Sequence, residues 1–276
     1  MQKFISLLKE IEPVLRQEKA GRGFAREGAL IQMDPSPMVI IGDIHADAKA
    51  LGSILSEAMI EDKFAEGWKL VFLGDYADRG PDPLEVYSSV FELKIAHPDN
   101  VFILKGNHEA ADIFPFQPHD VPWHLSQLFP GSWRDIYLEL ARVQGLFATA
   151  AIVDAWLLLL HGGVFPGMTR RTLVSPTRDE LKLILWSDPD EGQQKVSPSP
   201  RGAGIHFNYE VTREVLTTLN VKHIVRSHQV ISGGYKFNHG GLVLTVISAK
   251  NVFELERGAF LSIMPFEPLA KGIKLF

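Results

Sequence analysis

Two carboxylates and a guanidinium occur within five residues of one another, directly after an apolar run. Residues 70–73 are apolar, and Asp75, Asp78 and Arg79 follow in a glycine-rich stretch. This pattern is typical of a strand that ends in a loop, and α/β sheets bind ligands at the carboxyl ends of their strands. Asp75 is therefore a candidate metal ligand and Arg79 a candidate phosphate ligand. An acidic surface turn would give the same local pattern, so the stretch alone decides nothing.

Two further oxygen ligands recur at a constant interval. Asp43, Asp75 and Asn107 stand 32 residues apart in each step, and each follows a short apolar run. The interval is close to the length of one strand-helix-strand unit with a right-handed crossover. Helical patterns over residues 48–59 and 84–96 fill the two intervals. We therefore expect three metal-capable side chains at one edge of one sheet.

Histidines accompany these ligands at positions that follow expected strands: His45, His108, His161 and His228. His45 lies two residues after Asp43, which in extended backbone places both side chains on the same side. A single histidine is more often structural than functional. Together with the stretch that contains Asp75, the motifs around these four histidines make five in order, each at the end of an expected strand, and they indicate a site for divalent cations.

The composition describes a globular chain with a large core, since 46% of its 276 residues are hydrophobic and 22% are charged. The net charge of −5 argues against a nucleic-acid partner, because such a surface needs clustered Lys and Arg. The chain contains no cysteine, which excludes disulfides, thiolate metal sites and cysteine nucleophiles. Any metal must be bound by oxygen and imidazole.

The N-terminal region predicts a helix that packs on the rest of the chain. Charged residues interrupt residues 1–21, which argues against a signal peptide, and apolar residues recur there at helical spacing. The longest apolar region, residues 146–160, contains Asp154 and is too short to cross a membrane. We expect two buried strands in that region, and a cytoplasmic protein that does not associate with membranes.

Six motifs in this order resemble those of the PPP family of serine/threonine protein phosphatases, within the calcineurin-like metallophosphoesterase superfamily. They are Gly42-Asp43-Ile44-His45, Gly74-Asp75-Tyr76-Ala77-Asp78-Arg79-Gly80, Gly106-Asn107-His108-Glu109, His161-Gly162-Gly163, Trp186-Ser187-Asp188-Pro189 and Arg226-Ser227-His228-Gln229. The resemblance spans about residues 38–264. It implies an α/β fold with a central β-sandwich of two mixed sheets, flanked by helices, and a dinuclear metal site at the carboxyl ends of the strands. We expect residues 1–276 to form a single metallophosphatase catalytic domain, with residues 1–30 as an N-terminal helical extension packed on it.

The resemblance implies six metal ligands. One divalent cation would be bound by Asp43, His45 and Asp75, and the other by Asp75, Asn107, His161 and His228. Oxygen and imidazole ligands suit borderline ions. We expect two divalent metal ions, with manganese supporting activity and iron or zinc as alternatives.

The resemblance also implies a phosphate site and a proton donor. Arg79 and Arg201, together with Asn107, match phosphate-binding residues, and His108 matches a general acid that Asp78 orients. The implied reaction is hydrolysis of phosphoserine and phosphothreonine monoesters by direct attack of a water or hydroxide that bridges the metals. Phosphoproteins or phosphopeptides would be the substrates. Two cations about 3.5–4 Å apart suit this in-line displacement.

The chain departs from the family pattern at several positions. Ala46 replaces a usual glycine and Lys105 a usual arginine, and residues 248–252 lack a proline and a following tyrosine, which removes a polar aromatic contact over the site. Residues 110–133 differ most, with five aromatic residues among four prolines. This segment would form either a rigid rim for an extended substrate or, as is commoner for such residues, a part of the core.

Two other functions fit some of the same residues. A nucleotide phosphoesterase of the symmetrical diadenosine tetraphosphatase type has a similar Arg79-Gly80-Pro81-Asp82 stretch, but that group tends to have Asp at the position of Glu109 and lacks the later motifs. A catalytically inactive binding module on the same fold is disfavoured, because every expected ligand and the general acid are present.

Overall fold

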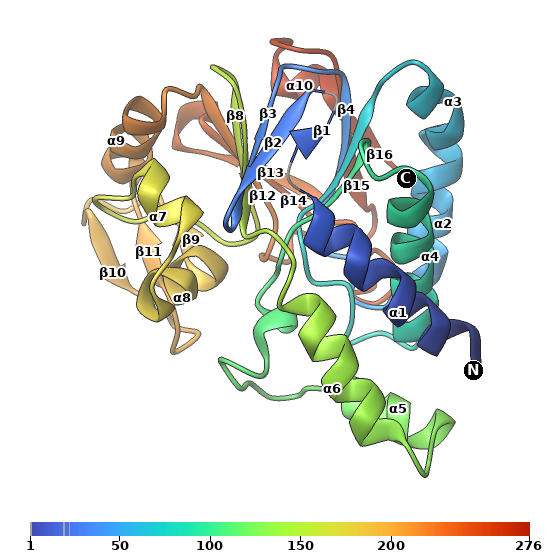
Figure 1. Cartoon of the computed structure of the whole chain (residues 1–276). Helices are drawn as coiled ribbons and strands as arrows, with labels where there is room; N and C mark the ends of the chain where they lie inside the picture. The colour runs from blue at the N-terminus through green and yellow to red at the C-terminus, as the bar shows by residue number, and fades with distance from the viewer. Residues whose placement is uncertain (1, 19, 22) are drawn as a thin grey trace.

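Two mixed β-sheets lie face to face between layers of helices in the computed structural model, which describes residues 2–18, 20–21 and 23–276 (Figure 1). The five-stranded sheet has the order β16-β15-β4-β5-β6. Its strands are β4 (Met38–Ile41), β5 (Lys69–Phe72), β6 (Val101–Ile103), β15 (Ala259–Ile263) and β16 (Ile273–Leu275). β4, β5 and β6 are parallel, as the constant interval between Asp43, Asp75 and Asn107 predicts.

The eight-stranded sheet has the order β1-β2-β3-β7-β8-β12-β14-β13. Its strands are β1 (Ala20–Gly21), β2 (Phe24–Glu27), β3 (Leu30–Met33), β7 (Ala150–Val153), β8 (Leu157–Leu160), β12 (His223–Arg226), β13 (Tyr235–Asn238) and β14 (Val243–Val246). β8, β12 and β14 are parallel neighbours. β7 and β8 are the two buried strands expected within residues 146–160. A third sheet that the sequence did not predict contains β9 (Asp188–Pro189), β10 (Val196–Pro198) and β11 (Ile205–Phe207).

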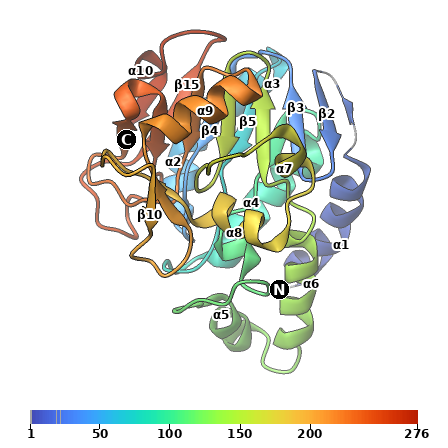
Figure 2. The same ribbon diagram turned by 90° about the vertical axis from the view of Figure 1, so that its left-hand side faces the viewer.

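The helices cover the outer faces of both large sheets, as Figures 1 and 2 show from two directions. They are α1 (Gln2–Gln17), α2 (Ala48–Glu57), α3 (Ile60–Ala65), α4 (Pro83–Ala96), α5 (Val121–Leu128), α6 (Trp133–Gln144), α7 (Arg170–Val174), α8 (Arg178–Trp186), α9 (Tyr209–Leu219) and α10 (Leu269–Gly272). Two short 3₁₀ helices, η1 (His108–Ala110) and η2 (His239–Gly241), complete the described elements. Among the helices of the described residues, none has the length and apolar character needed to cross a bilayer.

Alternation along the strands separates three buried layers. In β4, Met38 and Ile40 contact the residues between the sheets, whereas Val39 and Ile41 pack against the helices on the other side. In β8, Leu158 faces outward beneath α9, α8 and α7. Because both faces of these strands are buried, their sequences are continuous apolar runs. The expected α/β fold, with two mixed sheets flanked by helices, is confirmed.

The N-terminal region is helical over a shorter length than expected. α1 ends at Gln17, and its apolar side contacts α4 and α6. Of the remaining residues up to 30, those that the structure describes as regular elements form β1, β2 and the first residue of β3. Antiparallel pairing of β2 with β3 satisfies their backbone groups at the edge of the large sheet. Residues 1, 19 and 22 of the expected extension lie outside the described residues.

The loops after β5 and β6 approach so closely that only glycine fits between them. Gly74 has φ 109°, and a Cβ added there would lie 2.3 Å from the backbone nitrogen of Gly106. This approach places Asp75 beside the loop that carries Asn107. The absence of a side chain at Gly74 is therefore a condition for the assembly of the candidate site.

Gly74→Ala should lower the free energy of unfolding by at least about 2 kcal/mol, because it adds both a strained backbone and a backbone clash. Urea unfolding measures the change. Gly52→Ala is the matched control, since Gly52 lies in α2 with no atom within 4 Å of an added Cβ. That change should raise stability by about 0.5–1 kcal/mol. Equal unfolding midpoints for Gly74→Ala and the wild type would contradict this account.

Candidate metal centre and active site

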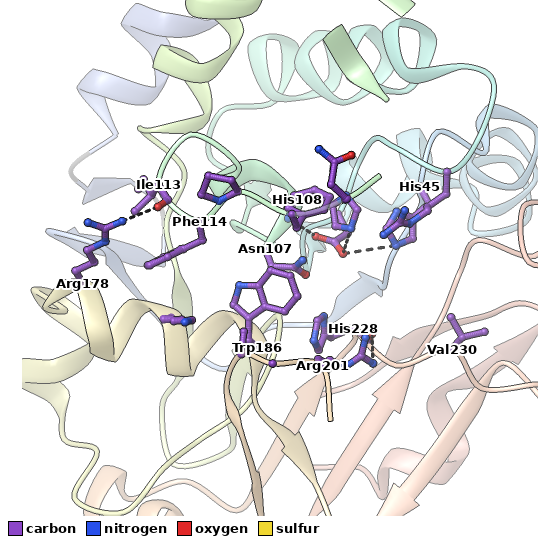
Figure 3. Close-up of a pocket in the computed structure, with 18 of the residues that line it drawn as sticks. His45, Asn107, His108, Ile113, Phe114, Arg178, Trp186, Arg201, His228 and Val230 are labelled. Atoms are coloured by element: carbon purple, nitrogen blue, oxygen red, sulfur yellow. Dashed lines mark hydrogen bonds and ion pairs between the residues drawn. The ribbon is translucent and has the colours of Figure 1, made fainter. Parts of the chain in front are cut away.

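A cavity of about 670 Å³ opens where the carboxyl ends of strands from both large sheets meet (Figure 3). β4, β5 and β6 contribute the motifs of one sheet, and β8 and β12 those of the other. Among the residues that line the cavity are His45, Asp75, Asn107, His108 and His228. The side chains that the sequence singled out thus come together from five strands of two sheets.

The first candidate metal position lies between the loops after β4 and β5. His45 Nε2 is 3.8 Å from Asp43 Oδ2 and 3.5 Å from Asp75 Oδ2. The expectation of extended backbone between Asp43 and His45 is wrong, because His45 has φ 48° and lies in a turn. Backbone hydrogen bonds from Ile44 and His45 to the carbonyl of Asp75, at 3.0 and 2.9 Å, hold this turn against the neighbouring loop.

The second candidate position joins the two sheets. His161 Nε2 lies 3.4 Å from Asp75 Oδ2, 2.9 Å from Asn107 Oδ1 and 3.1 Å from His228 Nδ1. Asp75, His161 and His228 form one group whose ligand atoms all lie within 4.8 Å of one another. Asp75 is thus shared between the first and second positions.

The environment of these residues fits divalent cations. All six expected ligands are buried: Asp43, His45, Asp75, Asn107, His161 and His228. Burial raises the pKa of Asp43 and raises that of Asp75 well above its usual value. It also lowers the pKa of His45 to about 4 and holds the pKa of His161 and of His228 well below the usual range. Neutral imidazole lone pairs and carboxylate oxygens that converge in a buried space are the ligands that divalent cations need.

His108 is linked to a chain of polar groups behind the cavity. Its Nδ1 atom lies 2.7 Å from Asp78 Oδ2, and Asp78 Oδ2 also lies 2.9 Å from Nδ1 of His119. The Nε2 atom of His119 is 3.0 Å from the Tyr137 hydroxyl. Burial favours a neutral Asp78, but hydrogen bonds with His108 and His119 outweigh it and hold the pKa of Asp78 below its usual value. Burial lowers the pKa of His108 to about 4, and Asp78 offsets this only in part.

Both arginines expected to bind phosphate line the cavity, and a hydrogen bond to another part of the chain holds each of them. Arg201 lies in the loop between β10 and β11, and its Nε donates to Asp188 Oδ2 at 2.9 Å. The other oxygen of Asp188 accepts from buried Arg226 at 2.8 Å. Arg79 is exposed and donates to the Pro118 carbonyl at 3.1 Å. The connection between β9 and β11 that contains Arg201 includes strand β10.

Glu109 joins the loops of the site through hydrogen bonds, a role that the sequence did not indicate. Its Oε2 accepts from the backbone N–H groups of Asp75 and Gly106, both at 2.9 Å. Its Oε1 accepts from the N–H of Tyr76 and from the hydroxyl of Tyr87, both at 3.1 Å. Burial raises the pKa of Glu109 to about 7, against the opposing effect of these donors. A carboxylate two residues after a candidate ligand is the only sequence signal for this role.

The site is also where left-handed backbone concentrates. Twelve non-glycine residues of the described ranges have positive φ, and half of them belong to its loops: His45, Ala46, Asp75, Asp78, Arg79 and His228. Such conformations cost of order 1–3 kcal/mol each and cluster at functional sites. Ala46 has φ 57°, which explains why glycine suits this position better.

Residues 110–133 combine both roles that the sequence left open. Phe129 is buried and Trp133 packs on the same core, whereas Phe114 and Phe116 line the cavity. Trp123 is 61% exposed, so it does neither. Phe253 also lines the cavity, and its ring lies 5.3 Å from that of His45. The loop that includes residues 248–253 lacks the polar aromatic contact of the family, as expected, and Phe253 provides an apolar aromatic contact with the site instead.

Glu109→Gln should lower the free energy of unfolding by roughly 2–3 kcal/mol, because one amide oxygen cannot accept four hydrogen bonds and the new NH₂ would face buried donors. Urea unfolding tests this, with Glu139→Gln as the control. Glu139 forms a surface pair with Arg142 and should matter by less than about 0.5 kcal/mol. Equal losses in the two variants would show that Glu109 does not organise the loops.

Comparison with known proteins agrees with this geometry. Two curated relatives are named as serine/threonine-protein phosphatases: one from Encephalitozoon cuniculi, 31% identical over 77% of this chain, and one from Caenorhabditis elegans, 30% identical over 90%. The chain covers 46% and 65% of their respective lengths. A solved serine/threonine phosphatase from Saccharomyces cerevisiae with similarity to human PP5 has the same fold, with a TM-score of 0.78 and 22% identity, covering 100% of this chain and 88% of that one. The sequence profile described as "Calcineurin-like phosphoesterase" matches residues 36–232, so the chain belongs to the calcineurin-like phosphoesterase family.

Proposed function

We propose that this chain is a metal-dependent phosphoprotein phosphatase that hydrolyses phosphoserine and phosphothreonine monoesters. The observation that carries the proposal is that two groups of buried metal-capable side chains, His45-Asp75-His108 and Asp75-His161-His228, share Asp75. They open onto one cavity that Arg79 and Arg201 also line. The names of the two relatives at about 30% identity support the same substrate class. Divalent cations at these positions, with manganese expected and iron or zinc as alternatives, would polarise the phosphoryl oxygens.

The phosphate would be bound by the residues that line the cavity around the metal ligands. Arg201 is held through Nε by Asp188 and through Nη2 by the carbonyl of His228 at 3.4 Å, which leaves Nη1 to donate to a phosphate oxygen. Arg79 lines the same cavity from the loop after β5, and Asn107 lines it from the loop after β6. Guanidinium donors in fixed positions stabilise negative charge that develops on a transferring phosphoryl group.

His108 is placed to move a proton at the leaving oxygen. Because its Nδ1 is engaged by Asp78, Nε2 is the atom that would give a proton to the departing serine or threonine oxygen. His119 bonds the same carboxylate, and two backbone N–H groups also donate to Asp78. These contacts fix Asp78, and Asp78 in turn orients the imidazole and favours its charged form.

The substrate class is tested by comparing turnover of phosphoserine, phosphothreonine and phosphotyrosine peptides with that of diadenosine tetraphosphate. The metal-loaded protein should prefer the phosphoserine and phosphothreonine peptides, and exhaustive chelation should abolish turnover of all four. A clear preference for the dinucleotide would instead favour the nucleotide phosphoesterase.

His108→Asn should lower the rate on a phosphoserine peptide by on the order of 10²–10⁴, the range for general acid-base catalysis. The loss on p-nitrophenyl phosphate should be distinctly smaller, because nitrophenolate leaves without a proton. Asp78→Asn should show the same pattern more weakly.

Metal content must be measured in the same variants, since His108 Nε2 lies 3.8 Å from Asp75 Oδ2 and is itself within reach of a cation. Loss of one metal equivalent in His108→Asn would make it a ligand. Equal rate losses on the two substrates, with full metal content, would remove its role at the leaving group.

A further inference from the structure

One face of α8 presents two cations to the cavity that the proposed reaction does not use. Arg178, Lys182 and Trp186 are spaced four residues apart, so their side chains leave the helix on the same side. All three line the cavity. The other side of α8 packs Ile184 into the core, and a capping box fixes its first turn. The direction of this face is therefore set by the fold.

The two cations lie at increasing distance from the candidate metal ligands. Trp186 is at the near end, where its ring lies 5.7 Å from that of His228. A helix rises 1.5 Å per residue, so Lys182 lies about 6 Å and Arg178 about 12 Å further along the axis. Figure 3 shows Arg178 and Phe114 on the opposite side of the cavity from His45.

Neither cation is neutralised within the described part of the chain. Lys182 is half-buried and has no hydrogen bond or ion pair there. Arg178 donates to the Ile113 carbonyl at 2.9 Å, and no carboxylate lies within 4.0 Å of it. Arg201, by contrast, is paired with Asp188. Cations on an exposed helix face are commonly only solvated. These two line a cavity in which Asp75 is the one carboxylate among the described lining residues, and such a cavity concentrates positive potential.

An aromatic wall connects the two ends of the cavity. The ring of Phe116 lies 4.2 Å from that of His108 and 6.2 Å from that of Trp186. Further out, the guanidinium of Arg178 lies 5.5 Å from the Phe114 ring. A substrate chain with its phosphate at the metal end would cross this wall before it reaches the two cations.

We propose that Lys182 and Arg178 form a second anionic subsite, which binds an acidic side chain or a second phosphate group of a phosphopeptide whose scissile phosphate lies at the metal end. The inference rests on the proposed function and adds a substrate preference to it. An extended peptide advances about 3.3–3.6 Å per residue, so the distance of about 6–12 Å from Trp186 to the two cations corresponds to about two to four residues beyond the one that passes Trp186.

The test is a set of phosphoserine peptides of equal length, each with one glutamate or one additional phosphoserine at a different distance on either side. The ratio of kcat/KM for each acidic peptide to kcat/KM for the neutral peptide is measured in low and in physiological salt. The wild type should prefer the best acidic peptide by about 3- to 30-fold, mainly through KM, and salt should reduce the preference. The glutamate and phosphate series distinguish a carboxylate from a phosphate ligand.

The Lys182→Gln and Arg178→Gln double variant should bring this ratio to within about twofold of unity, because both donors are lost. Lys182→Arg keeps the charge and should retain the preference. Lys236→Gln removes a charge from exposed β13, outside the cavity, and should change neither the ratio nor the basal rate. Thermal unfolding of each variant verifies that it is folded.

Each remaining outcome is decisive. A wild-type ratio near unity at every position, with the neutral phosphopeptide still hydrolysed, would overturn the subsite alone. A preference for acidic peptides that persists in the double variant would show that the anionic subsite lies elsewhere. If hydrolysis of diadenosine tetraphosphate depends on Lys182 and Arg178 and hydrolysis of peptides does not, the subsite binds a polyphosphate and the peptide proposal is overturned. No turnover of any phosphopeptide would overturn the proposed function and the subsite together.

Discussion

The site depends on the way in which Asp75 is held between loops from different strands. Its Oδ2 atom lies 3.4 Å from His161 Nε2 and 3.5 Å from His45 Nε2, and its Oδ1 accepts from the N–H of His108 at 3.0 Å. Its carbonyl accepts two N–H groups from the loop after β4, and its own N–H donates to Glu109. Asp75 therefore sets the distance between the two candidate metal positions. Parallel strands that end at one edge make this convergence geometrically possible.

Bringing these groups together lowers the stability of the folded chain, and packing and hydrogen bonds around the site offset this cost. Asp43, Asp75 and Glu109 are all buried, and burial together with mutual repulsion raises the pKa of Asp75. The loops add the cost of left-handed residues. Against these terms stand the core between the two sheets and the hydrogen bonds that cross between loops, such as the 2.7 Å bond from the N–H of Asp43 to Ser227 Oγ. Divalent cations would neutralise the converging carboxylates directly, so the same groups that oppose folding favour metal binding.

The sequence predicted the parts of the site that depend on strand order. Apolar runs of fixed spacing located Asp43, Asp75 and Asn107 at one edge, because a crossover unit has a nearly constant length. It did not predict the turn conformation of His45, which is imposed by the carbonyl of Asp75 from another strand. Nor did it predict the roles of Glu109 and His119, since their partners lie on loops that no local pattern brings together. Tertiary hydrogen bonds determine those positions.

α8 links the chemistry of the site to its outer wall. Its last residue, Trp186, packs against His228, and the chain then continues directly to Asp188, whose carboxylate holds Arg201 and Arg226. The backbone of Asp188 pairs with His206 in the small sheet, so the proposed phosphate-binding end of the cavity is fixed by strand pairing as well as by charge. Of the two cations of the outer wall, in contrast, Arg178 is exposed and Lys182 half-buried, and neither is paired with a carboxylate in the described part of the chain. Under the proposed function, groups with rigid support suit the reacting centre, where small displacements are costly, whereas weakly held cations would adapt to the varied sequences that flank a phosphorylated residue.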